Sequence, residues 1–361
     1  MNGTRLREVL TPAPPAEWSA VAAADPRTLV SQTPAATRAA ARAWGAADGS
    51  ILYVFVDGTR AVLPGVRIGL GGAARLASQP AAWGFGGLIA DRSLRAGHLA
   101  AVLDDLRHRG PAQVHLRPNP LDASLWQEAA GGLPVVRPAQ AGVVDLRGGW
   151  ERVRDDAFSK GTRRLIRHAE REGVEVRCSA TDDDLDAFLL LLRTSVTRWA
   201  RRDGEVPAVA HLRRSIRDPR RRLQRLRDAI GPSFRLYLAS LGDRTVSGAL
   251  VLQGTNAHYT RGAMDIDAVG NSGATHLLQA TAIEAAARAG CAHYHMGDSA
   301  PGSGLEAFKR RLGALPVPYA SYRLERLPLT RWEAVARGTA RTLLVRTPGP
   351  SGPDTKAGAR A

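Results

Sequence analysis

Lysine is the rarest cationic residue in this sequence, and its positions point to chemistry. Of the 50 lysine and arginine residues, only three are lysines: Lys160, Lys309 and Lys356. A lysine ammonium is a compact charge with three donors on a narrow stem, which arginine does not reproduce. Lys356 lies in a terminal tail, so we single out Lys160 and Lys309. An ammonium at Lys309 could stabilise the oxyanion formed when a nucleophile attacks a carbonyl.

The segment around Lys309 is the most specific in the chain. His295 to Tyr319 reads as the end of a strand, a loop with three glycines, and a short helix that stops at Gly313. Loops at strand ends are where open α/β sheets bind ligands, and glycines allow close approach of the backbone. Removal of a proton from an attacking amine could fall to Asp298, to His295 or to the substrate itself. The substrate-binding candidates here are Phe308, Ser299 and Gly304.

The densest basic feature is the segment from Ser159 to Val176. Ser159 is a plausible N-cap, and the cations after it recur at helical spacing of three and four residues. Such a helix could bind a phosphate chain, either a nucleotide diphosphate or an RNA backbone. The alternative is a solvated helix face with Glu170 and Glu172 as counter-charges. The candidate phosphate- and tRNA-binding residues are Lys160, Arg163, Arg164 and Arg167.

Other familiar motifs are incomplete. His293, His295 and Asp298 lie close together, but no further ligand follows at a metal-binding spacing. The stretch RIGLGGA at 67–73 is followed too soon by Pro80 for the crossover helix of a dinucleotide site. We therefore predict no metal and no resident cofactor.

Composition limits the class of protein. The 361 residues are 44% hydrophobic and 23% charged, which is typical of globular chains of about two domains. No run is long and apolar enough to span a membrane, and the N-terminus has no export signal, so a cytoplasmic location is expected. Fifty basic against 34 acidic residues give a net charge of +16, which favours polyanionic partners.

One arrangement of elements occurs twice. A hairpin turning at Asp57-Gly58 precedes a helix over Leu94–Arg109 that stops at Gly110 and a strand. A second hairpin turning at Gly242-Asp243 precedes a helix over 273–289, a stop at Gly290 and a strand. The spacing predicts two copies of one mixed α/β domain. Three helices are expected between them, over 159–173, 182–202 and 209–229.

Four elements in order resemble the FemAB-type branch of the GNAT acyltransferase superfamily. They are LASQPAAWGFGGL at 76–88, the basic segment at 159–174, the helix ATHLLQATAIEAAARAG, and GLEAFKRRLGA at 304–314. The resemblance implies two tandem GNAT-like domains and transfer of an amino acid from aminoacyl-tRNA to an amine. It implies that Lys309 stabilises charge at the reacting ester, and Tyr259 and Arg261 become candidates for holding the acceptor. No long coiled-coil hairpin lies between Arg198 and Phe234, unlike in some members.

We therefore predict an α/β (α+β) protein with two tandem GNAT-like domains, each a mixed sheet flanked by helices. The expected parts are a flexible N-terminus (1–14), a first domain (15–150), a second, catalytic domain (151–330), a C-terminal helix (331–346) and a disordered tail (347–361). The expected partners are charged tRNA as donor and a small-molecule or peptide amine, possibly phosphorylated, as acceptor. Two alternatives stay open: an acyl-CoA-dependent N-acyltransferase, and a non-catalytic protein that binds RNA or an anionic surface.

Overall fold

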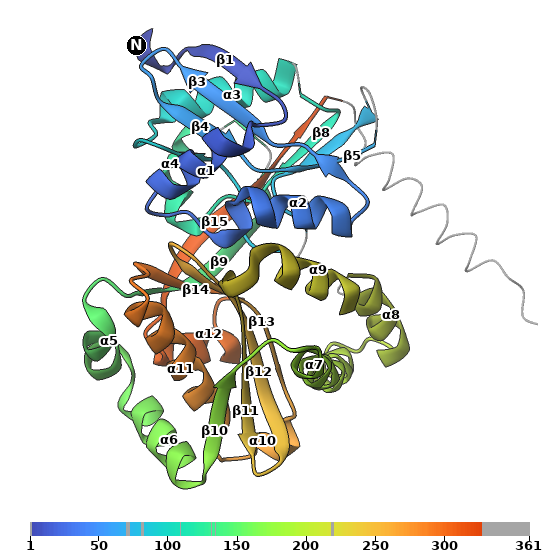
Figure 1. Cartoon of the computed structure of the whole chain (residues 1–361), viewed down its shortest axis with the longest axis vertical. Helices are drawn as coiled ribbons and strands as arrows, with labels where there is room; N and C mark the ends of the chain where they lie inside the picture. The colour runs from blue at the N-terminus through green and yellow to red at the C-terminus, as the bar shows by residue number, and fades with distance from the viewer. Residues whose placement is uncertain are drawn as a thin grey trace, which may run out of the picture.

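The computed structural model describes residues 2–326, except 70–72, 81–82, 109, 131, 134 and 218–219. The chain forms two lobes, with the N-terminal lobe at the top of Figure 1. The expected C-terminal helix and tail, 331–346 and 347–361, lie outside the described residues. The prediction of a flexible N-terminus over 1–14 is wrong for residues 6–10, which are ordered in a strand. They form β1 (Leu6–Leu10), which pairs with β3 (Ile51–Phe55) because Leu6 and Val9 pack on the core of this lobe.

Two sheets organise the described part of the chain. The smaller has the order β1-β3-β4-β7, with β4 at Arg60–Leu63 and β7 at Ile89–Ala90. The larger is an eleven-stranded sheet that runs through both lobes. Its order is β10 (Val174–Cys178), β11 (Phe234–Leu241), β12 (Arg244–Gln253), β13 (Ala257–Met264), β14 (His293–Asp298), β9 (Val135–Asp145), β15 (Leu315–Glu325), β8 (Gln113–Leu116), β6 (Arg75–Ala77), β5 (Val66–Ile68) and β2 (Ala47–Asp48).

Helices cover both faces of the large sheet in the lower lobe. One apolar cluster joins the sheet to α11 and α6, and a second joins the opposite face to α7, α9 and α2 of the upper lobe. The helices of the upper lobe are α1 (Pro15–Ala24), α2 (Pro34–Ala43), α3 (Ala96–His108) and α4 (Ala123–Ala129). Those of the lower lobe are α5 (Gly149–Arg152), α6 (Lys160–Arg171), α7 (Asp182–Arg202), α8 (Pro207–Arg217), α9 (Arg220–Ile230), α10 (Ile266–Val269), α11 (Ala274–Arg288) and α12 (Gly304–Arg311).

Local sequence signals explain most helix boundaries. The Ser159 hydroxyl accepts the N–H of Thr162 at the start of α6, as its N-cap position predicts. Thr181 and Asp184 form a reciprocal capping box at the start of α7. The single helix expected over 209–229 is instead two, α8 and α9. The sequence has Pro219 between them, and proline cannot donate the backbone hydrogen bond that a continuous helix needs.

The two lobes exchange strands at the middle of the large sheet. β9 precedes the predicted boundary at residue 150, yet it lies between β14 and β15. β15 belongs to the predicted second domain, yet it pairs with β8 of the first, through Tyr322 opposite Leu116. The predicted mixed α/β domains are therefore joined by continuous hydrogen-bonded pairing and not by a linker alone.

A wedge opens in the sheet between β13 and β14. These parallel strands pair only at their first residues, Ala257 with Tyr294 and His258 with His295. Farther along, β13 keeps its pairing with β12, whereas β14 shifts register against β9 between His295 and Gly297. Gly297 has a φ of +69°, a conformation that favours glycine because it has no Cβ. The two strands therefore diverge beyond this point.

Helix α6 lies directly against the N-terminus of α11. Gly273, the N-cap of α11, has a φ of +74°, and a Cβ built on it would lie 2.4 Å from the carbonyl oxygen of Leu165 in α6. Glycine is therefore required at this position both for conformation and for space.

We expect Gly273→Ala to destabilise the fold by roughly 3 kcal/mol, since a left-handed alanine and a clash with α6 backbone are combined. The matched control is Gly290→Ala, which also has a positive φ but has nothing within 4 Å of the added methyl. It should lose only about 1 kcal/mol. Urea unfolding of both variants measures the difference, and equal losses would contradict the α6–α11 contact.

Candidate functional site

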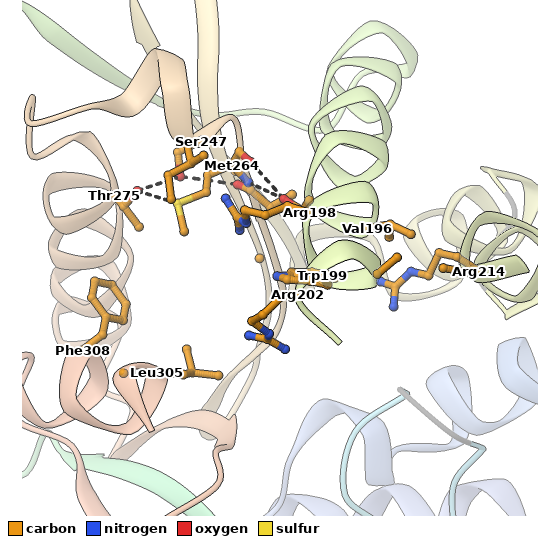
Figure 2. Close-up of a pocket in the computed structure, with 18 of the residues that line it drawn as sticks. Val196, Arg198, Trp199, Arg202, Arg214, Ser247, Met264, Thr275, Leu305 and Phe308 are labelled. Atoms are coloured by element: carbon orange, nitrogen blue, oxygen red, sulfur yellow. Dashed lines mark hydrogen bonds between the residues drawn. The ribbon is translucent and has the colours of Figure 1, made fainter. Parts of the chain in front are cut away.

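A cavity of about 840 Å³ lies beside the wedge in the lower lobe, and we call it the transfer cavity. Its walls come mainly from α7, β13, the first turns of α11, and α12, with further residues from α8, β12 and α10. Figure 2 shows Phe308 and Leu305 on the side of α12, opposite Arg198, Trp199 and Arg202 of α7. Residues of β12 and β13 line it on the sheet side, whereas β14 contributes none of the described lining residues.

Hydrogen bonds fix the upper wall of the transfer cavity. The Ser195 hydroxyl donates to the carbonyl of Met264 and accepts its N–H, both at 3.0 Å, which ties α7 to the end of β13. The Thr275 hydroxyl reaches the Ser247 hydroxyl at 3.4 Å (Figure 2), which ties the first turn of α11 to β12. Both helices are therefore held to the sheet where the strands part.

Arg198 supplies a charge without a direct partner to this cavity. Its Nη1 is buried, and its guanidinium makes no hydrogen bond or ion pair with any described residue. Burial, with a smaller effect from Arg202, lowers the pKa of Arg198, although the carboxylates of Asp265 and Asp267 partly offset this lowering. Burying a charged group without a partner is costly, and a carboxylate or phosphate in the cavity would remove that cost. The cavity is therefore suited to an anionic ligand.

A second hollow of about 650 Å³ adjoins the first, between α6 and the start of α11, and we call it the α6–α11 groove. It shares Met264, Ile266, Thr275 and Phe308 with the transfer cavity. Its basic lining comes from α6, through Arg164, His168 and Arg171. Neither arginine has an ion pair within the described ranges, so the groove presents free positive charge.

The four predicted phosphate-binding residues of α6 separate into two groups. Arg164 lines the groove, and Lys160 and Arg167 are exposed on the same helix without lining it. Arg163 turns the other way: its Nη1 donates to the carbonyl oxygens of Arg154, Asp155 and Phe158. Arg163 therefore holds the segment before α6 in place. His168 and Arg171, at helical spacing from Arg164, lie where the predicted set did not extend.

Lys309 is buried at the end of β14. Its Nζ donates to the carbonyl oxygens of Gly297 at 2.8 Å and Asp298 at 2.7 Å, and only 3% of the residue is exposed. Burial lowers its pKa to about 8, against a smaller upward effect of Asp298. An ammonium has three donors, so one N–H remains beyond these two bonds. Lys309 itself lines neither the cavity nor the groove, whereas its neighbour Phe308 lines both.

Asp298 joins the two lobes. Its Oδ2 accepts a hydrogen bond from Arg117 at 2.9 Å, and its Oδ1 accepts one from the Tyr319 hydroxyl at 2.8 Å. Arg117 also lies over the Phe85 ring, with 4.8 Å from its Cζ to the centroid. Arg117 comes from the end of β8, and Phe85 belongs to the loop at 76–88 that carried part of the family resemblance. Both carboxylate oxygens are thus occupied by links between the lobes.

His295 is fully buried where β13 and β14 begin to separate. Neither ring nitrogen has a hydrogen-bond partner, and Phe85 and His258 surround the ring at 5.8 and 6.1 Å between centroids. Burial, assisted by His293, lowers the pKa of His295 to about 3, so the ring stays neutral. The described cavity lining includes neither His295 nor Asp298, and their predicted catalytic roles stay predictions.

A β-bulge separates the two residues predicted to hold the acceptor. Tyr259 pairs with Val251 and Arg261 pairs with Leu250, so one extra residue, Thr260, turns the strand over. Tyr259 therefore faces α11 and lines the transfer cavity, and burial raises its pKa to about 12. Arg261 faces the opposite side with Leu250 and is buried. The structure does not bring the two side chains together.

The remaining predicted residues and the missed ones complete the site. Gly304 and Phe308 line the cavity, whereas Ser299 is buried beside β9, where its N–H donates to Gln140. The sequence prediction missed Arg198, Trp199 and Arg202. A signal was available in the run TRWARR, because residues 198, 199 and 202 share one helix face at i, i+1 and i+4. No trio of His, Cys, Asp or Glu gathers as a metal site in the described part of the chain.

Comparison with known proteins settles the type of domain. The model of the acetyltransferase (GNAT) domain family matches residues 157–310. These residues form a GNAT domain. The match includes α6, the wedge, α11 and Lys309, so the transfer cavity lies within an acyltransferase domain of this superfamily.

Solved structures extend the likeness to the whole chain. FemX matches with a TM-score of 0.65 and 14% identity, over 91% of this chain and 99% of FemX. A conserved protein of unknown function from Bacteroides thetaiotaomicron matches with a TM-score of 0.52 and 9% identity, over 86% and 97% of the two chains. A search of curated proteins gives no significant match. The expected FemAB-type two-lobed fold is confirmed. Among the described helices, none has the length and hydropathy needed to cross a bilayer.

The unpaired charge of Arg198 gives a direct prediction. Pyrophosphate or a dicarboxylate should bind to the transfer cavity and quench or shift the fluorescence of Trp199, and Arg198→Met should weaken this binding at least roughly tenfold. Arg201→Met, on the exposed side of the same helix, is the matched control and should bind as the native chain does. Titration by calorimetry measures both, and equal weakening by the two variants would contradict a specific role for Arg198.

Proposed function

We propose that this chain is an aminoacyltransferase that moves an amino acid from aminoacyl-tRNA to the amine of an acceptor. The acceptor is a peptide, a peptidoglycan precursor or a natural-product intermediate. The resemblance to FemAB-type proteins and the FemX-like fold support this reaction class. The reaction would take place in the cytoplasm, where charged tRNA is found.

The observation that carries the choice of donor is the contact of α6 with the start of α11. A coenzyme A diphosphate needs free backbone N–H groups at a helix N-terminus. Here three N–H groups are already bonded: that of Ser272 donates to the Val269 carbonyl, that of Ala274 to the Ser272 hydroxyl, and that of His276 to the Gly273 carbonyl. Among the described residues of this turn, only the N–H groups of Gly273 and Thr275 are left for a ligand. The Leu165 carbonyl oxygen also packs against Gly273 and leaves no room for a side chain there, although Gly270, Asn271 and Gly273 line the α6–α11 groove. Both features disfavour an ordinary acyl-CoA donor.

The surface beside the groove favours a large polyanion instead. Lys160, Arg164, Arg167 and Arg171 are exposed along α6, next to the opening that leads to Phe308. A row of cations on a solvent-exposed helix can follow a nucleic-acid backbone. The charged 3′ end of a tRNA would then enter through the α6–α11 groove and place its ester near Phe308. The net charge of +16 agrees with such a donor.

The proposed reaction is aminolysis of the ester. The lone pair of the acceptor amine attacks the carbonyl carbon, a C–N bond forms, and the carbonyl oxygen becomes an oxyanion. Collapse of this intermediate breaks the C–O bond to the terminal ribose, and the proton leaving nitrogen passes to the ribose oxygen. The remaining N–H of Lys309 would stabilise the oxyanion. Arg198 would hold an anionic group of the acceptor on the other side of the cavity.

A transfer assay tests the donor. We expect labelled amino acid on total tRNA to be incorporated into an amine acceptor pool, and RNase treatment of the donor to abolish incorporation. Acyl-CoA alone should give none. Incorporation that survives RNase and needs acyl-CoA would contradict the proposal and favour an acyl-CoA-dependent acyltransferase. Binding of RNA with no transfer under any condition would favour the non-catalytic alternative.

The lowered pKa of Lys309 predicts a pH dependence. If the ammonium stabilises the oxyanion, Lys309→Met should reduce kcat by roughly 10²–10³-fold below pH 8. Above the pKa of about 8 the native lysine loses its proton, so the advantage of the native enzyme over Lys309→Met should fall as pH rises. The titration of the acceptor amine affects the native enzyme and Lys309→Met equally, so it cancels when their rates are compared as a ratio at each pH. A ratio that stays constant from neutral to alkaline pH would exclude the charge of Lys309 from the reaction.

A further inference from the structure

Helix α8 lies at the edge of the lower lobe (Figure 1). It presents an apolar stripe to solvent. Val206, Val209 and Leu212 follow one another at a spacing of three residues and are 62%, 54% and 63% exposed. The N–H of Val209 donates to the Val206 carbonyl, so Val206 begins this helical turn. We call these three residues the α8 stripe. Aliphatic side chains exposed to this degree in one row mark a surface that another molecule covers.

A groove of about 1010 Å³ continues the stripe onto α7. Leu212 lines it on α8, and Leu190, which is 64% exposed, lines it on α7 together with Arg193. Arg193 is exposed and has no bonded partner among the described residues. The apolar side chains are therefore accompanied by free positive charge on the same surface.

The charge around the stripe determines what could cover it. α8 and α9 together contain eight arginines and one acidic residue, Asp228, so their charge is strongly positive. Neighbouring acids neutralise part of this charge, because Arg213 pairs with Glu205, Arg220 with Asp186, and Arg227 with Asp182. A second copy of the chain would bring the same cations face to face. Residues 327–361 carry six basic and two acidic side chains, so that segment is also repelled. The remaining net positive charge therefore favours an anionic occupant.

The exposed aliphatic side chains then distinguish between the two kinds of anionic partner, RNA and a lipid bilayer. An RNA backbone offers phosphates to the arginines but no apolar surface to cover leucine and valine. An anionic bilayer offers both, because its headgroups attract arginines and its acyl boundary accepts short aliphatic side chains. A bilayer also needs no shape match to a protruding row. We infer that the α8 stripe, with Leu190 and Arg193, docks the protein on an anionic membrane surface.

Docking would place the transfer cavity next to the membrane. Ala210 and Arg213, on the neighbouring side of α8, line that cavity. An acceptor held at a bilayer surface would then reach the cavity along α8. The docking itself does not depend on the identity of the acyl donor.

Flotation of the full chain with lipid vesicles tests this inference. The chain should bind vesicles with about 30 mol% phosphatidylglycerol at least roughly tenfold more tightly than pure phosphatidylcholine vesicles, and high salt should weaken that binding. The double variant Val209→Ser/Leu212→Ser should lose roughly tenfold, and Arg193→Gln should lose a smaller factor. The matched control is Val56→Ser/Leu315→Ser, since these residues are 54% and 67% exposed elsewhere on the molecule. It should bind as the native chain does.

Three results would overturn the inference. The first is an absence of vesicle binding by the native chain. The second is equal loss for the α8 variant and the control variant, each shown to be folded by circular dichroism. The third is unchanged vesicle binding by the α8 variant with loss of its binding to total tRNA, which would make the stripe an RNA contact.

Discussion

The short parallel pairing of β13 and β14 is the constraint on which the site depends. Only two residue pairs join the strands before Gly297 turns β14 toward β9. The divergence leaves backbone unpaired in the middle of an eleven-stranded sheet, and unpaired buried backbone is costly. Lys309 reduces that cost by donating to the carbonyl oxygens of Gly297 and Asp298. The residue that the family resemblance assigns to chemistry thus also satisfies the backbone at the point where the strands separate.

The same strand end connects the lobes. β9 lies between β14 and β15, and β15 continues to β8, so the upper lobe is continuous with the wall of the site. Asp298 accepts hydrogen bonds from Arg117 of the upper lobe and Tyr319 of β15. A charged group bonded on both oxygens resists displacement, because removal of one partner leaves the other polar groups unsatisfied. We conclude that the first lobe supports the geometry of the transfer cavity.

Local signals in the sequence predicted much of this fold. The Ser159 cap, the glycine stops and the hairpin turns predicted α6, α11 and the strands around Asp57-Gly58 nearly as they are, because each is fixed by neighbours in the chain. The exchange of β9 and β15 could not be predicted in this way, because pairing partners such as Tyr322 and Leu116 lie 206 residues apart in the sequence. The directions in which individual side chains point could not be predicted from the sequence either. A bulge at Thr260 turns Arg261 away from Tyr259, and Arg163 turns back to cap three carbonyls. Arg198 was missed because its cavity exists only where α7 meets β13.

The central proposal is that the bonded N–H groups and the α6 contact at the start of α11 disfavour a coenzyme A diphosphate, and that the α6–α11 groove takes a nucleic-acid 3′ end. Calorimetric titration of the native chain with coenzyme A, and with a short RNA hairpin carrying an amide-linked amino acid at its 3′ end, tests this claim most directly. The account predicts saturable binding of the hairpin and none of coenzyme A, with the hairpin affinity falling as salt rises. Tight stoichiometric binding of coenzyme A, with no binding of the hairpin, would contradict it.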